Sequence, residues 1–223
     1  MIKKLIPALT IGLLASSIVA TDPASAYPPG RNLTSALTPD MVLAKTGKAS
    51  LNISNAKPQV SLNVSGYKSQ QNVSIDEAGF GTATLKSLTS GIWTVRVKQV
   101  YKNYGSDCAG LPSRQVPVDG KIVTECDVTE TALNTLYVPK VIAPKTVKIK
   151  SKLYIKLSYL KPKTLLTLTP TAGKKKKKAI KVKVGTKATT AKITIPAKTF
   201  VKGKNSFVLT IGKLKLTYKL TGK

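Results

Sequence analysis

Hydrophobic and polar residues alternate along most of this chain. A period of two is typical of β-strands that bury one face and expose the other. In the first half the alternating runs are Leu51/Ile53, Val60/Leu62/Val64, Val73/Ile75, Ala83/Leu85 and Trp93/Val95/Val97, followed by a run from Ile122 to Val128. In the second half they are Val147/Ile149, Leu153/Ile155/Leu157, Leu166/Leu168, Ile180/Val182/Val184 and Ile193/Ile195. The pattern predicts an all-β protein, because no stretch after the N-terminus competes as a helix.

The end of the chain predicts a β-hairpin. The runs Phe207/Leu209/Ile211 and Leu214/Leu216/Tyr218/Leu220 flank the dipeptide Gly212-Lys213. A two-residue loop that begins with glycine fits a type II′ turn. Such a turn places Ile211 opposite Leu214 on the same face of the sheet.

The first 26 residues have the composition of a signal peptide. Lys3 and Lys4 precede an apolar segment over residues 5–20, and Ala24-Ser25-Ala26 provides small residues for cleavage. We expect cleavage after Ala26 and a secreted, extracellular protein associated with the cell surface.

Charge divides the remaining chain into two parts. Residues 27–130 contain 11 basic and 8 acidic residues, whereas residues 131–223 contain 24 lysines and no arginine, histidine or acidic residue. Pro139 and Pro144 near the boundary suggest a short, stiff linker. We therefore expect two β-sandwich modules, over residues 27–130 and 146–223, joined by a linker over residues 131–145.

Two copies of one sequence pattern support this division. Asp76-Glu77-Ala78-Gly79 begins a turn and an alternating strand that ends at Leu85, and Leu88-Thr89-Ser90-Gly91-Ile92-Trp93-Thr94-Val95 follows. This pattern resembles the later strands of bacterial immunoglobulin-like domains, and residues 185–196 and 203–211 are similar to a second copy. Tyr27-Pro28-Pro29-Gly30 is similar to the start of exported surface proteins of Gram-positive bacteria. The resemblance implies Ig-like sandwich modules in an extracellular setting and implies no active site.

The two cysteines, Cys108 and Cys126, both lie in the part expected to be exported. An even pair in an oxidising compartment predicts a disulfide. It would close a loop of about 19 residues, which is worth roughly 3 kcal/mol in the chain-entropy description. The bridge would attach the long segment Tyr101–Asp119, expected as a loop, to the strand that contains Cys126. We expect no metal site, because histidine is absent and the cysteine spacing does not fit one.

The lysines of the second half predict a cationic surface. Like charges about 10 Å apart in water repel by roughly 0.4 kcal/mol before screening, and many such pairs add up. We expect this surface to contact an anionic partner, because edge protection by lysine does not require the exclusion of every acid. The alternatives for the lysine content are solubility and protection of strand edges, or a lysine-rich codon bias. Alternation places lysines on exposed strand faces, and a run of five forms an exposed tip. The predicted polyanion-binding residues are Lys148, Lys150, Lys152, Lys174, Lys175, Lys176, Lys177, Lys178, Lys181, Lys183, Lys215 and Lys219.

The composition argues against catalysis and against specific nucleic-acid recognition. Without histidine the chain lacks the commonest general base. Lysine acts as a point charge, whereas arginine reads guanine edges and grips phosphate bidentately. We expect no catalytic residue, no cofactor and no small-molecule substrate; non-specific, salt-sensitive contact with nucleic acid is compatible with this composition.

These observations lead to one main hypothesis and two alternatives. The main hypothesis is a secreted, non-catalytic protein that adheres electrostatically to an anionic envelope polymer, such as teichoic acid, capsule or an acidic lipid surface, and displays its N-terminal module. Tyr101, Tyr104 and Arg114 are the residues proposed for a specific contact by the Tyr101–Asp119 segment; the alternative is that this segment is a structural loop. The alternatives are a cationic membrane-active or antimicrobial protein, against which the lack of an amphipathic helix counts, and a structural subunit of a surface assembly.

Overall fold

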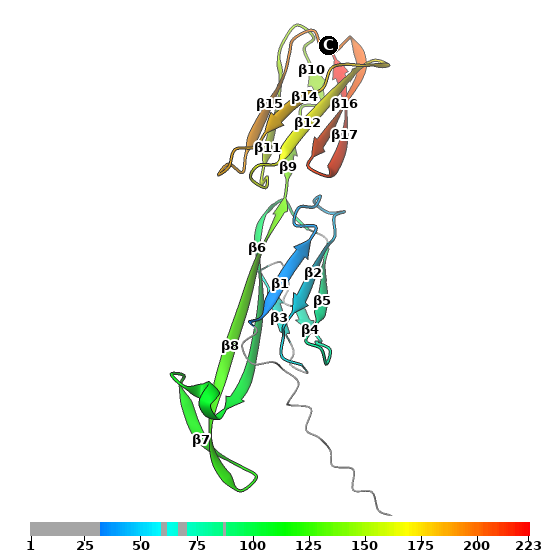
Figure 1. Ribbon diagram of the computed structural model, residues 1–223. Coiled ribbons are helices and arrows are strands. Elements are labelled where there is room, and N and C mark those ends of the chain that lie inside the picture. The colour runs from blue at the N-terminus through cyan, green and yellow to red at the C-terminus, as the bar shows by residue number, and fades with distance from the viewer. Residues whose placement is uncertain (1–31, 59–61, 67–70, 87) are drawn as a thin grey trace, which may run out of the picture.

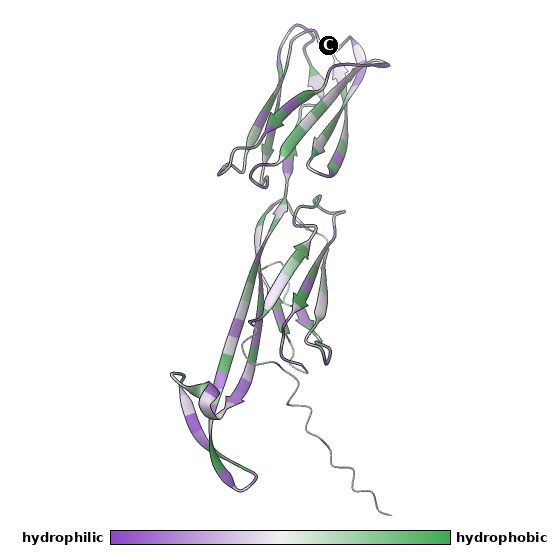
Figure 2. Cartoon of the chain, viewed as in Figure 1, coloured by the Kyte–Doolittle hydropathy of each residue, from purple (hydrophilic) through white to green (hydrophobic). Residues whose placement is uncertain are grey.

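The computed structural model describes residues 32–58, 62–66, 71–86 and 88–223. These residues form strands, turns and one short 3₁₀ helix, and they contain no α-helix, so the all-β prediction is confirmed. The strands form two sandwiches that stand end to end, with a long ribbon projecting from the first (Figure 1). Figure 2 shows hydrophobic and hydrophilic bands alternating along the strands of both sandwiches.

The first sandwich faces a three-stranded sheet against a larger one. The smaller sheet has the order β1-β2-β5 and consists of β1 (Thr34–Thr38), β2 (Ala49–Ser54) and β5 (Gly81–Leu85). The larger sheet has the order β4-β3-β6-β8-β7 and consists of β3 (Leu62–Ser65), β4 (Gln71–Val73), β6 (Gly91–Tyr104), β7 (Ser113–Val118) and β8 (Lys121–Val138). The described pairings within both sheets are antiparallel. The chain passes from one sheet to the other after β2, after β4 and after β5. Two facing antiparallel sheets connected in this way form an immunoglobulin-like sandwich.

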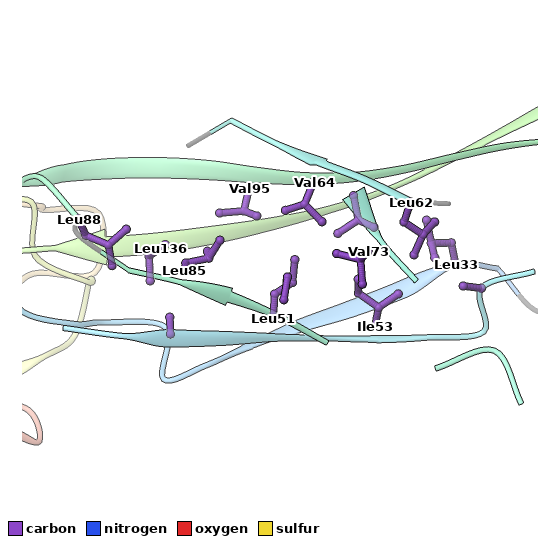
Figure 3. Close-up of a cluster of buried hydrophobic side chains, with 14 of the residues drawn as sticks. Leu33, Leu51, Ile53, Leu62, Val64, Val73, Leu85, Leu88, Val95 and Leu136 are labelled. Carbon is purple, nitrogen blue, oxygen red and sulfur yellow. The ribbon is translucent and has the colours of Figure 1, made fainter. Parts of the chain in front are cut away.

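The core of the first sandwich is aliphatic. Leu51 and Ile53 of β2 face Val64 of β3 and Val95 of β6 across the two layers (Figure 3). The turn before β5 is fixed by Asp76, whose carboxylate accepts hydrogen bonds from the amides of Ala78 and Phe80, and by Gly79 at φ 83°. The alternating runs at 51/53, 73/75, 83/85 and 95/97 are therefore the inward-facing positions; Val60 of the predicted run 60/62/64 lies outside the described residues.

The second sandwich repeats the arrangement of the first. Its smaller sheet has the order β15-β11-β9, with β9 (Lys140–Ile142), β11 (Leu153–Ser158) and β15 (Ala191–Ile195). Its larger sheet has the path β10-β17-β16-β12-β13, with β14 also paired to β12; these strands are β10 (Thr146–Val147), β12 (Leu165–Ala172), β13 (Lys175–Lys176), β14 (Ile180–Lys183), β16 (Gly203–Ile211) and β17 (Leu214–Gly222). β10 runs parallel to β17, and the other pairings of this module are antiparallel.

The core of the second sandwich contains an aromatic pair. Phe207 is fully buried in this core and stacks on Tyr218 with ring centroids 5.0 Å apart. Burial raises the pKa of the Tyr218 hydroxyl.

The C-terminal hairpin has the predicted register. Ile211 pairs with Leu214, and β16 and β17 remain paired as far as Gly203 and Gly222. Gly212 has a φ of 56°, a conformation that costs non-glycine residues energy.

Residues 131–145, expected as a linker, take part in both sandwiches. β8 continues to Val138, which pairs with Gly91 of β6, and β9 pairs with β11 of the second sandwich. The chain crosses between modules at residue 139, between the end of β8 and the start of β9. The linker was predicted too long because proline and the charge boundary do not reveal which strand a segment joins.

The junction between the modules is built around Met41. Its backbone bridges Tyr137 of β8, and its side chain packs against the second core. The neighbouring Asp40 forms a salt bridge with Lys161 of the second module. The expected signal peptide, residues 1–26, lies outside the described residues. No helix among the described residues has the length and apolar character needed to cross a bilayer.

Candidate polyanion-binding surface and the disulfide arm

Lysine and threonine cover the outer face of the larger sheet of the second module. The strand registers place Lys181 and Lys215 in one cross-strand row with Thr167 and Thr210 between them. A second row joins Lys176 to Lys219 through Thr171 and Ser206. Paired residues project to the same side of a sheet, so lysines occupy the margins of this face and hydroxyl side chains occupy its middle. The outward lysines of this face are Lys176, Lys181, Lys183, Lys204, Lys215 and Lys219.

The smaller sheet of the module is also cationic. Lys156 and Lys192 pair directly across β11 and β15, and Lys140 is the first residue of β9. The Lys192 ammonium group lies 4.0 Å from the centre of the Tyr154 ring, a cation–π arrangement. The cationic surface predicted from the sequence thus extends over both outer faces.

The remaining predicted lysines lie in connections. Lys148, Lys150 and Lys152 occupy the segment between β10 and β11, whereas we had expected them along one side of a strand. The run of five lysines begins in the turn after β12, passes through β13 and ends in the exposed connection to β14. Lysines at every second position from 148 to 152 are typical of a strand. The chain instead turns here, and the N–H of Ser151 donates a hydrogen bond to the carbonyl of Lys148.

Few of these charges are neutralised within the protein. Among the described lysines beyond residue 130, one, Lys161, forms a salt bridge, and its partner Asp40 belongs to the first module. Because no acidic residue follows Glu130, the second module has no acidic side chain of its own. The field of the lysines therefore extends into solvent.

The Tyr101–Asp119 segment, predicted as a loop, instead forms parts of β6 and β7 and a short 3₁₀ helix in a projecting arm. We call residues 99–130 the arm: the distal parts of β6 and β8, the 3₁₀ helix η2 (Gly105–Cys108) and β7. β3 pairs with β6 as far as Lys98, and beyond that point the described strands paired in the arm are β6, β8 and β7. In Figure 1 the arm runs past the other strands of the first sandwich, on the side away from the second sandwich. At about 3.3 Å per residue, the six residues from Gln99 to Tyr104 carry it roughly 20 Å.

The disulfide holds the tip of the arm. Cys108 and Cys126 are bonded, with Cα atoms 5.6 Å apart, and both are buried. The predicted disulfide is confirmed; it joins η2 to β8.

Glu125 organises the tip beside this disulfide. Its carboxylate lies 3.0 Å from the Lys102 ammonium group, accepts a 2.8 Å hydrogen bond from Arg114 Nε and another from the Tyr104 hydroxyl. The hydrogen bonds from Arg114 and then from Lys102 lower the pKa of Glu125, and the same carboxylate raises the pKa of Arg114. Tyr104 and Arg114, proposed from the sequence for an external contact, thus already have a partner inside the arm.

A second polar cluster lies where the arm leaves the sandwich. Glu130 accepts hydrogen bonds from the Tyr101 hydroxyl, the Gln99 amide and the backbone N–H of Leu33. Buried Gln99 also accepts from the backbone N–H of Lys57, whose ammonium group lies 4.4 Å from the Tyr101 ring centre. Tyr101, the third proposed contact residue, therefore anchors the base of the arm.

Apolar side chains are exposed along the arm. Ile122 is 70% exposed, and Val100, Tyr104, Leu111 and Val118 are exposed as well. Five of the nine acidic residues of the chain also lie here, at Asp107, Asp119, Glu125, Asp127 and Glu130. The described residues contain no group of three or more histidine, cysteine, aspartate or glutamate side chains that could hold a metal ion.

Comparisons with known proteins leave the chain without an assigned family. No protein-family model matches it, and no curated protein matches its sequence. It is similar to the structures of red sea bream transglutaminase (7% identity, TM-score 0.28), of a tetra-tandem repeat in the extending region of a large adhesion protein (13%, 0.28) and of the polymeric Ig receptor ectodomain of a teleost fish (11%, 0.29). Each match covers 86% of this chain, and the chain spans 31%, 48% and 98% of the three structures respectively. TM-scores this low do not support any conclusion about fold or function. The immunoglobulin-like fold is assigned from the strand pairing described above.

Sequence reasoning missed two features of these surfaces. Lys204 joins the outer lysines of the larger sheet, and its position opposite Thr221 follows from the hairpin register that the sequence does predict. The arm was missed because turn residues such as Gly105, Gly110 and Pro112 are typical of a loop, although the strands on either side remain paired.

Proposed function

We propose that this protein is a secreted, non-catalytic binding protein, whose lysine-rich second module adheres to an anionic polymer of a cell envelope. The observation that carries this proposal is the sequence from Lys140 to Lys223, with 24 lysines and no acidic residue, folded as a sandwich whose lysines are almost all without a carboxylate partner among the described residues. Contact with a polyanion lowers the free energy of a folded unit of this charge, since electrostatic attraction and counterion release both favour binding.

The distribution of lysines favours a polymer over a flat surface. Cations lie on both outer faces and in the connections, whereas a planar bilayer would contact one side. Polymer chains can reach all of these positions at once, which raises avidity without a new kind of contact.

The end-to-end arrangement supports a display role for the first module. The arm projects from the first sandwich on the side away from the second (Figure 1). Attachment through the second module would leave the arm, with its exposed Ile122 and Val118, away from the envelope. The bacterial, Gram-positive setting suggested by the sequence resemblance belongs to this proposal.

The proposal is tested by retention of the full mature chain on an immobilised polyphosphate or wall-polymer column developed with a salt gradient. We expect retention at low salt and elution as salt rises. Replacing the six outward lysines of the larger sheet with glutamine should move elution to lower salt, whereas arginine at the same positions should preserve it; the positions are Lys176, Lys181, Lys183, Lys204, Lys215 and Lys219. Passage of the unmodified protein through the column at low salt would overturn the proposal, and leakage of anionic lipid vesicles would favour the membrane-active alternative.

A further inference from the structure

A groove opens along one side of the second sandwich. Its volume is about 370 Å³. β14 pairs with β12 alone and β15 with β11 alone among the described strands, so each is an edge of its sheet. The groove is lined by Pro170 of β12, by the first residue of β14 and the residues before it, and by residues that follow β15: Pro170, Lys177, Lys178, Ala179, Ile180, Pro196, Ala197, Lys198 and Thr199.

The backbone around the groove is anchored. The N–H of Lys177 donates to the carbonyl of Pro170 at 2.8 Å. The N–H of Lys198 donates to the carbonyl of Ile149 at 2.7 Å, and Lys198 adopts a left-handed φ of 62°. The Thr199 hydroxyl donates to the carbonyl of Pro196 at 2.7 Å. The backbones of Lys177 and Lys198 are thus both hydrogen-bonded, one before β14 and the other after β15, and Lys178 directly follows Lys177.

The lining combines three lysines with five aliphatic residues. Lys177, Lys178 and Lys198 supply point charges, while Pro170, Ala179, Ile180, Pro196 and Ala197 supply aliphatic contact. No acidic side chain of this module competes for the ammonium groups. Ammonium groups without a fixed planar geometry suit a tetrahedral oxyanion. The volume is at the small end of the range of ligand pockets, about 300–1,000 Å³.

We propose that this groove binds one charged repeat of the envelope polymer, a phosphate or sulfate ester carried on a short polyol or sugar. The inference deepens the proposed function and rests on it: the outer lysines provide diffuse attraction, and the groove provides a discrete, saturable site. The three lysines hold the oxyanion, and the aliphatic lining residues contact the carbon skeleton of the repeat.

Two variants of equal charge separate a discrete site from diffuse attraction. One is Lys177→Gln/Lys178→Gln/Lys198→Gln in the full mature chain. The control is Lys163→Gln/Lys187→Gln/Lys213→Gln, which removes three exposed charges from the connections before β12, between β14 and β15 and between β16 and β17. None of these lysines lines the groove or belongs to the outward lysines of the larger sheet. The probes are a glycerol phosphate tetramer and a sulfated disaccharide, which distinguish the two oxyanions, with affinity measured by calorimetry.

We expect saturable binding of at least one probe by the unmodified chain, a loss of about tenfold or more in the groove variant and a change within about twofold in the control. Backbone amide shifts at Ala179 and Ala197 in NMR titrations of the unmodified chain provide a readout that needs no variant. Equal weakening in both variants, or shifts spread over the outer faces, would overturn the groove site. If neither short probe binds but the polyphosphate column still retains the chain, the groove inference fails alone; if the column also fails to retain it, the proposed function fails too.

Discussion

The β6–β8 hairpin of the first sandwich and the β16–β17 hairpin of the second have the same place in the topology but end differently. β16 and β17 close after two residues, at Gly212-Lys213. β6 and β8 continue beyond the sandwich as the arm, acquire β7 as a third strand and carry a disulfide. The same scaffold therefore supports a closed hairpin in one module and an extended one in the other.

The surroundings of each hairpin explain the difference. A Cβ atom at Gly212 would lie 3.1 Å from the Met41 side chain, so the second hairpin ends against the first module. At Gly120, in the turn between β7 and β8, no atom would lie within 4 Å of such a Cβ. A hairpin can extend only where its turn points away from the other module. No opposite sheet covers the extended part, so it must be stabilised by contacts within the hairpin itself.

The largest expected effect tests whether the two cores are independent. Phe207→Ala should destabilise the second sandwich by about 3–5 kcal/mol, because the side chain is fully buried. Trp93 is the single tryptophan and packs against the first core, so its fluorescence should keep its unfolding midpoint while far-ultraviolet circular dichroism shows an earlier transition. Leu136→Ala in the first core is the matched control and should shift the Trp93 midpoint. A shift of that midpoint by Phe207→Ala would show that the sandwiches unfold as one unit.

Removing the disulfide should act on the arm alone. We expect the double variant Cys108→Ser/Cys126→Ser to lose about 3 kcal/mol of local stability in the chain-entropy description. Hydrogen exchange should accelerate in η2 and β7 and stay unchanged in β2 and β3. Faster exchange in β2 would mean that the arm and the first sandwich form one cooperative unit.

Alanine at the two hairpin turns should sharpen the contrast between them. Gly212→Ala should destabilise the second sandwich by about 1–2 kcal/mol through its left-handed φ, with a further cost from the contact with Met41. Gly120→Ala carries the same kind of backbone penalty, at φ 76°, without a contact. Thermal unfolding measures the destabilisation by Gly212→Ala, and amide hydrogen exchange in β7 measures that by Gly120→Ala. If Met41→Ala does not relieve part of the Gly212→Ala cost, the junction does not limit the second hairpin.

Acid should loosen the tip of the arm. Because the pKa of Glu125 is lowered in the folded state, its stabilising contribution is fully present above the ordinary glutamate pKa of about 4.3 and is lost as pH falls through the lowered value. NMR should show the carboxyl of Glu125 titrating below that ordinary value, together with amide shifts in β7. Glu125→Gln should abolish this dependence; its persistence in the variant would assign it to another acid.

The smallest effect is expected from removing the arm tip. A variant that joins Tyr101 to Val128 through Asn-Gly keeps Gln99, Tyr101 and Glu130, which anchor the base. The first core contains no residue from 102–127, so its Trp93 midpoint should stay within experimental error. A marked decrease in the Trp93 midpoint would show that the arm stabilises the first sandwich. Removal of the arm could then not be used to test the display role in the proposed function.

The alternation of side chains determined most of the strands and both cores. Leu153, Ile155 and Leu157 are buried as their spacing requires, and Gly212-Lys213 places Ile211 opposite Leu214 as predicted. These features follow from local chemistry, because a period of two assigns faces and a glycine turn assigns register. The disulfide also followed from the sequence, since it contains a single pair of cysteines.

The tertiary structure decided where these elements meet. Tyr101, Tyr104 and Arg114 became internal partners of Glu130 and Glu125 because β6 and β8 pair far beyond the sandwich, over residues remote in sequence. The groove likewise joins residues 177–180 to residues 196–199 across two sheet edges. The sequence by itself determined that the second module is a cationic β-sandwich; which lysines converge, and which hairpin extends into an arm, depended on non-local packing that no short window of residues encodes.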